Sequence, residues 1–547
     1  MAIRTSCQIP TMSTSNTDSP RLGGGSSVSY LLRAAKKELE TLLLSRGIAT
    51  TVDSEEISAV ERDALELLRL SRCWKNRPAP ISRLPPEVLA LIPDFLEEKS
   101  REDIIIPLSH VCRSWREIFT SRSSLWTNFR CVDAEKTRVY LQRSKSSPIS
   151  LWLKRNEGPI SDDPFLQIPS HAISRLEYLD LLTTPEYLNK ISDHLSLPTP
   201  CLQDLCITGV PDFAGAIPLL PPTIFNGDLS TLRLLHLRYI HTDLPWRNML
   251  NLRSFSLRYG AWPGISVEKF LDFFESAPHL RCVELSFATP TFGGQPGRLV
   301  SLPHLKILHI SGFQPSSLIL EHLLVPVGAQ ITTSLPSSRI VDHLPRSYDN
   351  LRNLSNFTAI SVEIRSPHVT IKLIGPNGQV CMNSLIDILH SPSYYLAQLD
   401  TSKIEGLEIF DSDPTSEDFY QALLPMKNLR TLTFSLCESI YSILALNPDP
   451  NSTNPIACPN LERLVIYTDD RADVKSVTKV AAARASKGVP FKTVGIIGRE
   501  EIASAEAVAD LRKYVLDVEL GVEIDVAGDG GFWRVFSDRC KLTSELV

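Results

Sequence analysis

The chain has 547 residues, a formal net charge of -6 at pH 7 and a hydrophobic fraction of 43%, which is ordinary for a soluble protein of several domains. The small net charge and the lack of an extended basic face argue against a nucleic-acid partner held by phosphate contacts, and no apolar run reaches the roughly 18 residues of a membrane span. The eleven cysteines are odd in number, scattered and without a CxxC pair, which favours a reducing compartment, cytoplasmic or nuclear, over a metal site or a disulfide framework.

The amino-terminal part begins with a predicted disordered tail at residues 1–27, which is rich in Ser and Thr and has no apolar core of a secretory signal. Residues 28–77 contain two amphipathic stretches, SYLLRAAKKELETLLLSRG and DSEEISAVERDALELLRLSRCW, joined by a short link. The spacing predicts an antiparallel helical hairpin. A dimerising coiled coil is the alternative, but each apolar stripe is too short for three or four sustained heptads.

The next segment opens with LPPE at residues 84–87, where prolines can start a helix without losing a hydrogen bond. Pro93 must bend or shorten this helix, whose inward face is predicted to include Phe95. A charged loop is predicted next. Apolar residues then recur at helical spacing in LSHVCRSWREIF, residues 108–119, and Leu125 and Trp126 follow. Such a small module cannot bury all its apolar surface alone, so the pattern indicates a partner-binding helical unit.

The combination of LPPE with VCRSWR resembles an F-box, here placed at residues 78–131. The resemblance implies a Skp-type adaptor as partner and, through it, a cullin. Trp115 has an alternative role in the core of the module itself. The residues implied in adaptor binding are Leu84, Pro85, Pro86, Leu89, Leu108, Val111, Cys112 and Trp115.

A second pattern, L-x-x-L-x-L with any large apolar residue allowed, recurs through residues 132–490. Most of its steps fall within the 20-to-29-residue period of leucine-rich repeats. Each match predicts a short strand followed by a helix or loop, and such units stack because none can cover its own apolar face. The asparagine that usually follows the strand is missing, so the repeats are degenerate. The nine matches begin at Leu176, Leu202, Leu232, Leu252, Leu280, Leu305, Ile404, Leu429 and Leu461.

The period falters between residues 311 and 403, which we predict to be an insertion or an irregular edge. Phe357 begins one further match, 52 residues after Leu305. VTIKLIGPNGQVCM, residues 369–382, predicts a strand pair with a tight turn. In the carboxyl-terminal segment 491–547, FKTVGII predicts a strand and EEIASAEAVADLRKYVLDVE, residues 500–519, predicts a helix, which together would cap the open end.

The predicted fold class is therefore mixed α/β: a helical hairpin, a small all-α F-box, and an α/β leucine-rich-repeat solenoid with an irregular insertion and a cap. This layout is similar to the large F-box families of mushroom-forming fungi. In such repeats the residues between and just after the spaced leucines line one face of the sheet, which could bind a substrate. The alternative is that these residues form a solvated strand edge with no binding role. Arg and Tyr are enriched at energetically dominant interface positions. The candidate substrate-binding residues are His236, Arg238, Tyr239, Arg258, Tyr259, Glu284, Phe287 and His309, and Glu408, Phe410 and Asp411 lie at equivalent positions.

Catalytic patterns are missing from the sequence: it has no GxSxG elbow, HExxH, phosphate loop or GxGxxG. We therefore expect no catalytic, cofactor or metal site. The leading expectation is a substrate-recognition subunit of an SCF-type cullin-RING ubiquitin ligase, in the cytoplasm or nucleus, with an unknown protein target and neither nucleic acid nor membrane as partner. The alternatives are an adaptor-bound, non-degradative scaffold and an unrecognised enzyme with its site in the irregular region.

Overall fold

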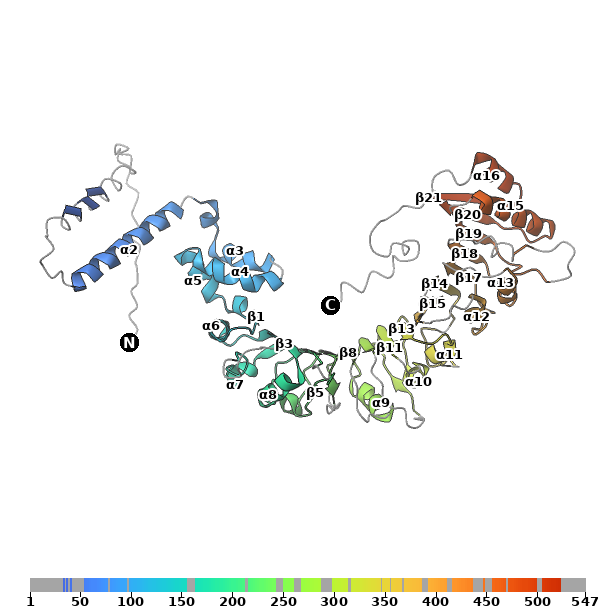
Figure 1. Ribbon diagram of the computed structural model, residues 1–547. Coiled ribbons are helices and arrows are strands. Elements are labelled where there is room, and N and C mark those ends of the chain that lie inside the picture. The colour runs from blue at the N-terminus through green and yellow to red at the C-terminus, as the bar shows by residue number, and fades with distance from the viewer. Residues whose placement is uncertain are drawn as a thin grey trace, which may run out of the picture. The chain divides into compact units, whose positions relative to one another are not determined.

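The fold is given by a computed structural model (Figure 1), in which the chain divides into two compact units, residues 1–89 and 90–547. The structure describes residues 33–34, 36–37, 40–41, 54–76, 79–95, 98–154, 163–211, 215–242, 249–259, 267–286, 298–312, 316–345, 347–354, 356–365, 368–385, 392–410, 416–435, 446–447, 455–468, 471–498 and 504–522.

The helices with described bounds are α2 (Ser54–Asn76), α3 (Pro86–Leu91), α4 (Glu98–His110), α5 (Arg113–Ser121), α6 (Ala134–Ser144), α7 (Ser170–Ile173), α8 (Pro185–Leu195), α9 (Val267–Ser276), α10 (Ser317–Leu320), α11 (Ile340–His343), α12 (Pro392–Leu396), α13 (Ser416–Leu423), α15 (Arg471–Ser486) and α16 (Ala505–Leu511). The strands are β1 (Asn128–Arg130), β2 (Ile149–Lys154), β3 (Leu176–Thr183), β4 (Asp204–Gly209), β5 (Leu219–Leu220), β6 (Leu234–Arg238), β7 (His241–Thr242), β8 (Ser254–Arg258), β9 (Cys282–Ser286), β10 (Val300–Ser301), β11 (Ile307–Ser311), β12 (Leu323–Leu324), β13 (Gln330–Leu335), β14 (Ala359–Arg365), β15 (His368–Gly375), β16 (Gly378–Leu385), β17 (Gly406–Phe410), β18 (Thr431–Ser435), β19 (Arg463–Tyr467), β20 (Thr493–Gly498) and β21 (Asp517–Val522).

The first unit contains the second predicted helix of the hairpin as α2, a single helix of 23 residues. Its apolar side chains, including Leu65, Leu67 and Leu68, are exposed. The first predicted helix, over residues 29–47, lies largely outside the described residues, so the hairpin stays a prediction. A 3-10 turn at Pro80–Arg83 precedes the LPPE segment, and α3 begins at Pro86, where a first-turn proline was expected.

Three expectations from the sequence are wrong for the segment that follows α3 in the second unit. The predicted helix of residues 108–119 is interrupted: α4 ends at His110, and α5 begins at Arg113 after an extended Cys112. The predicted charged loop is instead the first part of α4, because Glu, Lys and Arg are good helix formers. A 3-10 turn at Ile92–Phe95 follows α3, since Pro93 cannot continue an α-helix, and the side chain of Phe95 lies outward rather than inward.

The rest of the second unit is dominated by one sheet, which has 17 strands among the described residues. Neighbouring strands follow one another along the chain from β1 to β13 and again from β17 to β21, always in parallel. The short pairs β5–β7 and β10–β12 form separate two-stranded sheets. Figure 1 shows helices α8 to α13 along one side of this sheet.

All nine L-x-x-L-x-L segments contain a strand, as predicted. The second and third apolar positions of each segment point into the core and lie in register with those of the next strand, as Leu235, Phe255, Val283 and Leu308 do. Helix α9 closes this core, where the ring of Phe273 lies 4.8 Å from that of Phe255, centroid to centroid. Alternating burial along parallel strands therefore explains the leucine spacing.

In eight of the nine segments the first apolar position lies in a recurrent turn before the strand, whereas Leu176 is the first residue of β3 itself. The amide of Leu252 donates to the carbonyl of Met249 at 3.0 Å, and equivalent bonds precede the other strands of this kind. A side chain just ahead of this position often bonds to the preceding unit: Asn251 donates to Ser230, Asn428 to Ser402 and Asn460 to Lys427. Sequence reasoning, which looked for asparagine after the strand, missed this recurring bond.

Among its described residues, the irregular region contains the short strand β12, the strand β13 that continues the parallel order of the main sheet, and a three-stranded meander of β14, β15 and β16. Strand β16 pairs in parallel with β13, β15 runs antiparallel between β16 and β14, and β14 pairs in parallel with β17. The chain thus enters the meander at its far strand and returns toward β13. The predicted strand pair with a tight turn is confirmed as β15 and β16, where Gly375 lies opposite Gly378.

At the carboxyl end, the predicted strand in FKTVGII is confirmed as β20. The helix predicted for residues 500–519 is wrong in its second half. Helix α16 ends at Leu511, and β21 begins at Asp517. Val518 pairs with Val494 of β20 and is buried, which favours strand over helix because it extends the same core row.

Candidate functional site

Helix α5 buries the tryptophan that the F-box pattern singles out. Trp115 is only 8% exposed, and its ring meets that of Phe119 edge-on with centroids 5.5 Å apart. The indole nitrogen of the buried Trp126 donates to the Phe119 carbonyl at 2.8 Å. The guanidinium of Arg143 lies 4.2 Å from the centroid of the Trp126 ring. This packing favours the alternative in which Trp115 stabilises the core of its own module.

In the first unit, the LPPE segment leaves its apolar side chains accessible. Leu84 is 40% exposed, and Pro85 and Pro86 are exposed as well. Leu89 is only 4% exposed, so its position suits packing rather than contact with a partner. The exposed Val88, which sequence reasoning did not select, lies one residue earlier on the same helix. An exposed apolar helix start is the kind of surface that a partner can cover.

In the second unit, the junction of α4 and α5 carries three of the predicted adaptor contacts. Val111 is 54% exposed, while Leu108 and Cys112 are half-buried. The carbonyl of Cys112 accepts from the amide of Arg116 at 2.9 Å and so starts α5. Phe95, which was expected inside, is 86% exposed. A partner that covers this side chain would remove its large apolar area from water, which is favourable.

The outward face of the sheet brings four polar side chains into one row. His236, Ser256, Glu284 and His309 occupy the same register on β6, β8, β9 and β11. Ser256 donates to Glu284 at 3.1 Å, and Arg258 forms an ion pair with Glu284 at 2.6 Å. The predicted candidates therefore include a real cluster on neighbouring strands.

Burial favours the neutral form of both histidines in this row. Burial lowers the pKa of His236 and of His309, Glu284 opposes that shift, and Arg258 adds to it. Burial likewise raises the pKa of the Cys206 thiol, next to His236 in the row, to about 11. The row thus offers hydrogen-bonding groups and one balanced ion pair rather than a reactive thiolate.

The two Arg-Tyr pairs stand at the end of β6 and β8. The rings of Tyr239 and Tyr259 stack with centroids 4.8 Å apart and planes 11° apart, and Arg238 lies over the Tyr239 ring. Both tyrosines have positive φ, 51° and 52°, which is unusual for a side-chain-bearing residue. Backbone bonds from Tyr239 to Arg258 and from Tyr259 to Ser286 hold this geometry. Strained residues of this kind gather at functional sites.

The other predicted face residues are only partly described. Phe287 and Asp411 lie outside the described residues. Glu408 lies on β17, in the same register as Ser361 of β14. Burial raises the pKa of its carboxyl, against a hydrogen bond from Ser361 and the charge of Lys372. The His236 row and Glu408 are therefore separate places on the sheet, separated by the meander.

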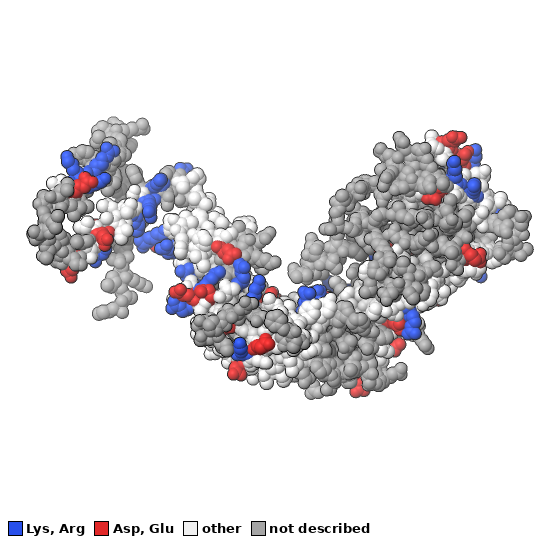
Figure 2. Space-filling model, viewed as in Figure 1, with Lys and Arg blue, Asp and Glu red and all other residues white. Residues whose placement is uncertain are grey.

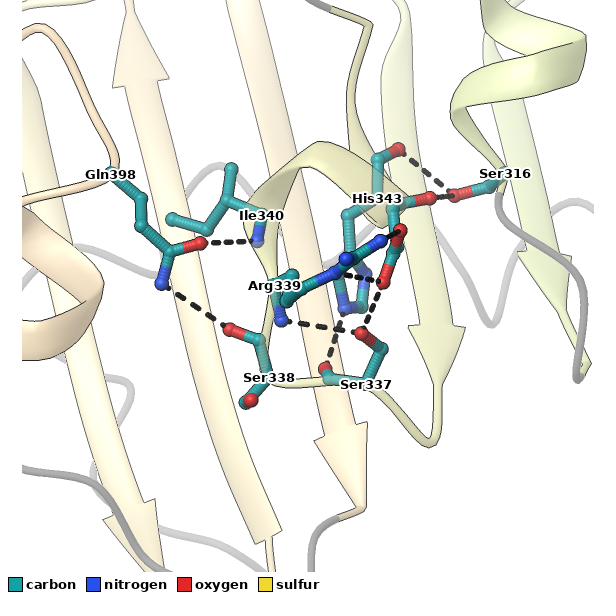
Figure 3. A network of polar contacts seen from close by, with 8 residues as sticks. Ser316, Ser337, Ser338, Arg339, Ile340, His343 and Gln398 are labelled. Atoms are coloured by element: carbon teal, nitrogen blue, oxygen red, sulfur yellow. Dashed lines mark hydrogen bonds and ion pairs between the residues drawn. The ribbon is translucent and has the colours of Figure 1, made fainter.

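A buried polar network, which sequence reasoning missed, lies inside the irregular region (Figure 3). The imidazole of His343 contacts the Thr333 hydroxyl at 2.8 Å and the Ser384 hydroxyl at 3.1 Å. It also contacts the Ser337 carbonyl at 3.1 Å, as Figure 3 shows. Thr333 occupies a core row where other strands place aliphatic residues, so His343 satisfies a hydroxyl that would otherwise be unpaired. The network joins β13 to β16 and has a structural role.

Within the described part of the chain, no group of three or more His, Cys, Asp or Glu side chains is arranged to hold a metal ion. No described helix is both long and apolar enough to span a membrane. On the face drawn in Figure 2, the coloured side chains around α16 carry both signs of charge.

The comparisons with known proteins concern one segment. A search of curated proteins found no match. The family model described as F-box-like matches residues 81–132, from the turn before LPPE to two residues beyond β1. F-box domains bind Skp-type adaptors, so an adaptor is the kind of partner expected for this segment. Together with the exposed LPPE corner and the tryptophan helix, this match supports an F-box protein with a ubiquitin-ligase-related, adaptor-binding role.

Proposed function

We propose that the chain is the substrate-recognition subunit of an SCF-type cullin-RING ubiquitin ligase. The observation that carries the proposal is the F-box-like segment, whose LPPE corner leaves Leu84 and its two prolines exposed. The F-box would bind a Skp-type adaptor and, through it, a cullin. The large parallel sheet would be a degenerate leucine-rich-repeat solenoid of the kind found in fungal F-box families. The protein would act in the cytoplasm or nucleus, with neither nucleic acid nor membrane as partner.

In this proposal the protein performs no chemistry of its own and is not an enzyme. Its polar sheet face, with the His236 row and the stacked Tyr239 and Tyr259, holds a target near the ubiquitin-loaded enzyme. Tethering raises the effective concentration of the target, typically to the millimolar range for short flexible connections, and so accelerates transfer without a new catalytic group. Charge reversal of both Arg238 and Arg258 should then weaken target capture and leave adaptor capture unchanged.

The adaptor-binding step is tested by affinity capture of the full chain and a Leu84→Ala, Pro85→Ala double variant. We expect the variant to lose the adaptor because it loses exposed apolar area, and to keep its target. The matched control is a Leu299→Ala, Pro303→Ala double variant, which removes the same atoms from exposed positions elsewhere. Equal adaptor capture by all three proteins would contradict the proposal. Capture of adaptor without cullin would favour the non-degradative scaffold.

A further inference from the structure

The amino-terminal edge of the sheet carries a row of cations that the proposed function does not use. Arg233, Arg253, Arg281 and Lys306 each stand immediately before a strand, and all four side chains are exposed. Backbone bonds join them in sequence: the amide of Arg253 donates to Arg233, that of Arg281 to Arg253, and that of Lys306 to Arg281, at 2.7 to 2.8 Å. We call these four residues the basic row.

The four side chains of the basic row form no ion pair with any described residue. Arg233 is near Asp204, whose pKa is raised by burial and by Glu177 and is lowered by that arginine. Like charges at directly opposite positions of neighbouring strands repel each other, so the arrangement has an energetic cost that an anionic ligand would remove.

The surroundings of the row are suited to an extended ligand. A concave pocket of about 340 Å³ is lined by Arg233 and Arg253 together with Gln203 and Asn251. Glu177 also lines it, and its carboxylate accepts a hydrogen bond from the Gln203 side chain at 3.0 Å. Beside the other two cations, the exposed rings of His279 and His304 stack with centroids 5.5 Å apart. Hydrogen-bonding and planar groups therefore flank the charges along the whole row.

The length of the row selects the class of ligand. Neighbouring strands are about 4.8 Å apart, so four cations span about 14 Å. An extended peptide advances about 3.3 to 3.6 Å per residue, so about five residues cover the row. Nucleic-acid affinity grows with the number of phosphate contacts, and four cations in a chain with a net charge of -6 provide few of them. A short acidic peptide segment therefore fits better than a nucleic acid.

We propose that the basic row binds an extended acidic segment of the protein target, rich in Asp and Glu or phosphorylated. This inference rests on the proposed function, because it names the chemistry of the target. Arginine guanidinium groups take carboxylates and phosphates with paired hydrogen bonds, so both kinds of anion suit the same row.

The matched control is the same edge in the second half of the sheet. There the equivalent positions before β17 to β20 are Glu405, Arg430, Glu462 and Lys492, bonded through the same backbone ladder. The signs alternate, and Lys492 forms an ion pair with Glu462 at 2.8 Å. This edge should bind acidic peptides weakly, although it shares the geometry of the basic row.

The test measures fluorescence anisotropy of labelled peptides with the full chain. The probes are a peptide with five consecutive glutamates, its glutamine counterpart, a phosphoserine version and a ten-nucleotide oligo-uridine. An Arg253→Glu, Arg281→Glu variant should bind both acidic peptides about tenfold or more weaker, because each change replaces attraction with repulsion. The Arg430→Glu, Lys492→Glu control should stay within about twofold of wild type, since its row already carries two acids.

The two acidic probes distinguish the sources of negative charge, and tighter binding of either one through the basic row supports the inference. An Arg253→Gln, Arg281→Gln variant removes the two charges without reversing them. Intermediate affinity of this variant would show that the loss of binding follows charge and is not caused by misfolding. The inference is overturned if the row variant binds like wild type, if the glutamine peptide binds equally well, if no peptide binds, or if oligo-uridine binds tightest through the row. Adaptor capture is measured on the same preparations, so failure of the proposed function is seen separately.

Discussion

Two stretches of the sheet share one interior and differ at one edge. In β6 to β11 and in β17 to β20, the inward rows consist of buried aliphatic and aromatic residues in continuous register. At the amino-terminal edge, the first stretch presents four cations and the second alternates acids and bases. Stacking of the strands therefore requires apolar core residues but places no such requirement on the residues at the edge. The core positions are constrained by packing, whereas the edge positions are available for recognition.

The largest expected effect tests whether the two interiors are equivalent. Phe255→Ala in β8 should lower the free energy of unfolding by about 3 to 5 kcal/mol, and Leu432→Ala in β18 by about 2 to 5 kcal/mol, because both side chains are fully buried. Denaturant unfolding measures both values. The exposed Ser301→Ala serves as control. A negligible loss of unfolding free energy in only one of the two variants would show that the two stretches of the sheet are packed differently.

A second prediction compares two glycines. A Cβ at Gly209, at the end of β4, would lie 2.0 Å from the Tyr239 carbonyl oxygen, whereas one at Gly495 in β20 would approach no atom closer than 3.4 Å. Gly209→Ala should therefore cost about 1 to 3 kcal/mol by displacing the backbone at Tyr239, and Gly495→Ala should be nearly neutral. Thermal unfolding checks both. Comparable effects would contradict the close approach of β4 to Tyr239.

The third prediction concerns His343 of α11, which contacts β16 of the meander that separates the two stretches. Burial lowers the pKa of His343 below its ordinary value of 6.5, so the unfolded state binds the proton more readily than the folded one. The contribution to stability is complete above pH 6.5 and is lost as the pH falls below it, by at most about 1.4 kcal/mol per pH unit. A His343→Gln variant should show a weaker loss of stability with acid. Identical pH slopes for both proteins would exclude this role.

The smallest expected effect is a pair of opposite pKa changes in the His236 row. Arg258→Gln should raise the pKa of His236 and of His309, because the Arg258 charge lowers both, and Glu284→Gln should lower both. Lys372→Gln should leave these histidines unchanged and raise the pKa of Glu408 across the meander. NMR titration of the ring and carboxyl signals measures these shifts. Movement of only one histidine would argue against a shared electrostatic row.

Much of the local structure could be predicted from the residues. The leucine spacing located nine strands, since alternate residues of a strand face opposite sides and the inward ones must be apolar. It missed β13, because Gly328 and Thr333 stand where apolar residues were expected, and the Thr333 hydroxyl is satisfied by His343 of α11, ten residues further along the chain. The interruption at Cys112 was also missed, because helical spacing continues across the junction between two packed helices.

The candidate site was predictable in part. The positions after the leucines correctly led to the His236 row, but the ion pair of Arg258 with Glu284 was not anticipated, because its partners are 26 residues apart in the chain. The exposure of Phe95 was missed as well. Nothing in a helical pattern reveals that a proline-induced turn directs the next aromatic side chain outward.

By itself, the sequence determined the strand-forming segments, the proline-started helix and the F-box pattern, because these depend on neighbours only a few residues away. The tertiary structure alone decided the reversed order of the meander and the alignment of the basic row. Arg233, Arg253, Arg281 and Lys306 are separated by 20, 28 and 25 residues, and only the parallel register of their strands brings them together. Register is set by packing of the whole core rather than by any local pattern.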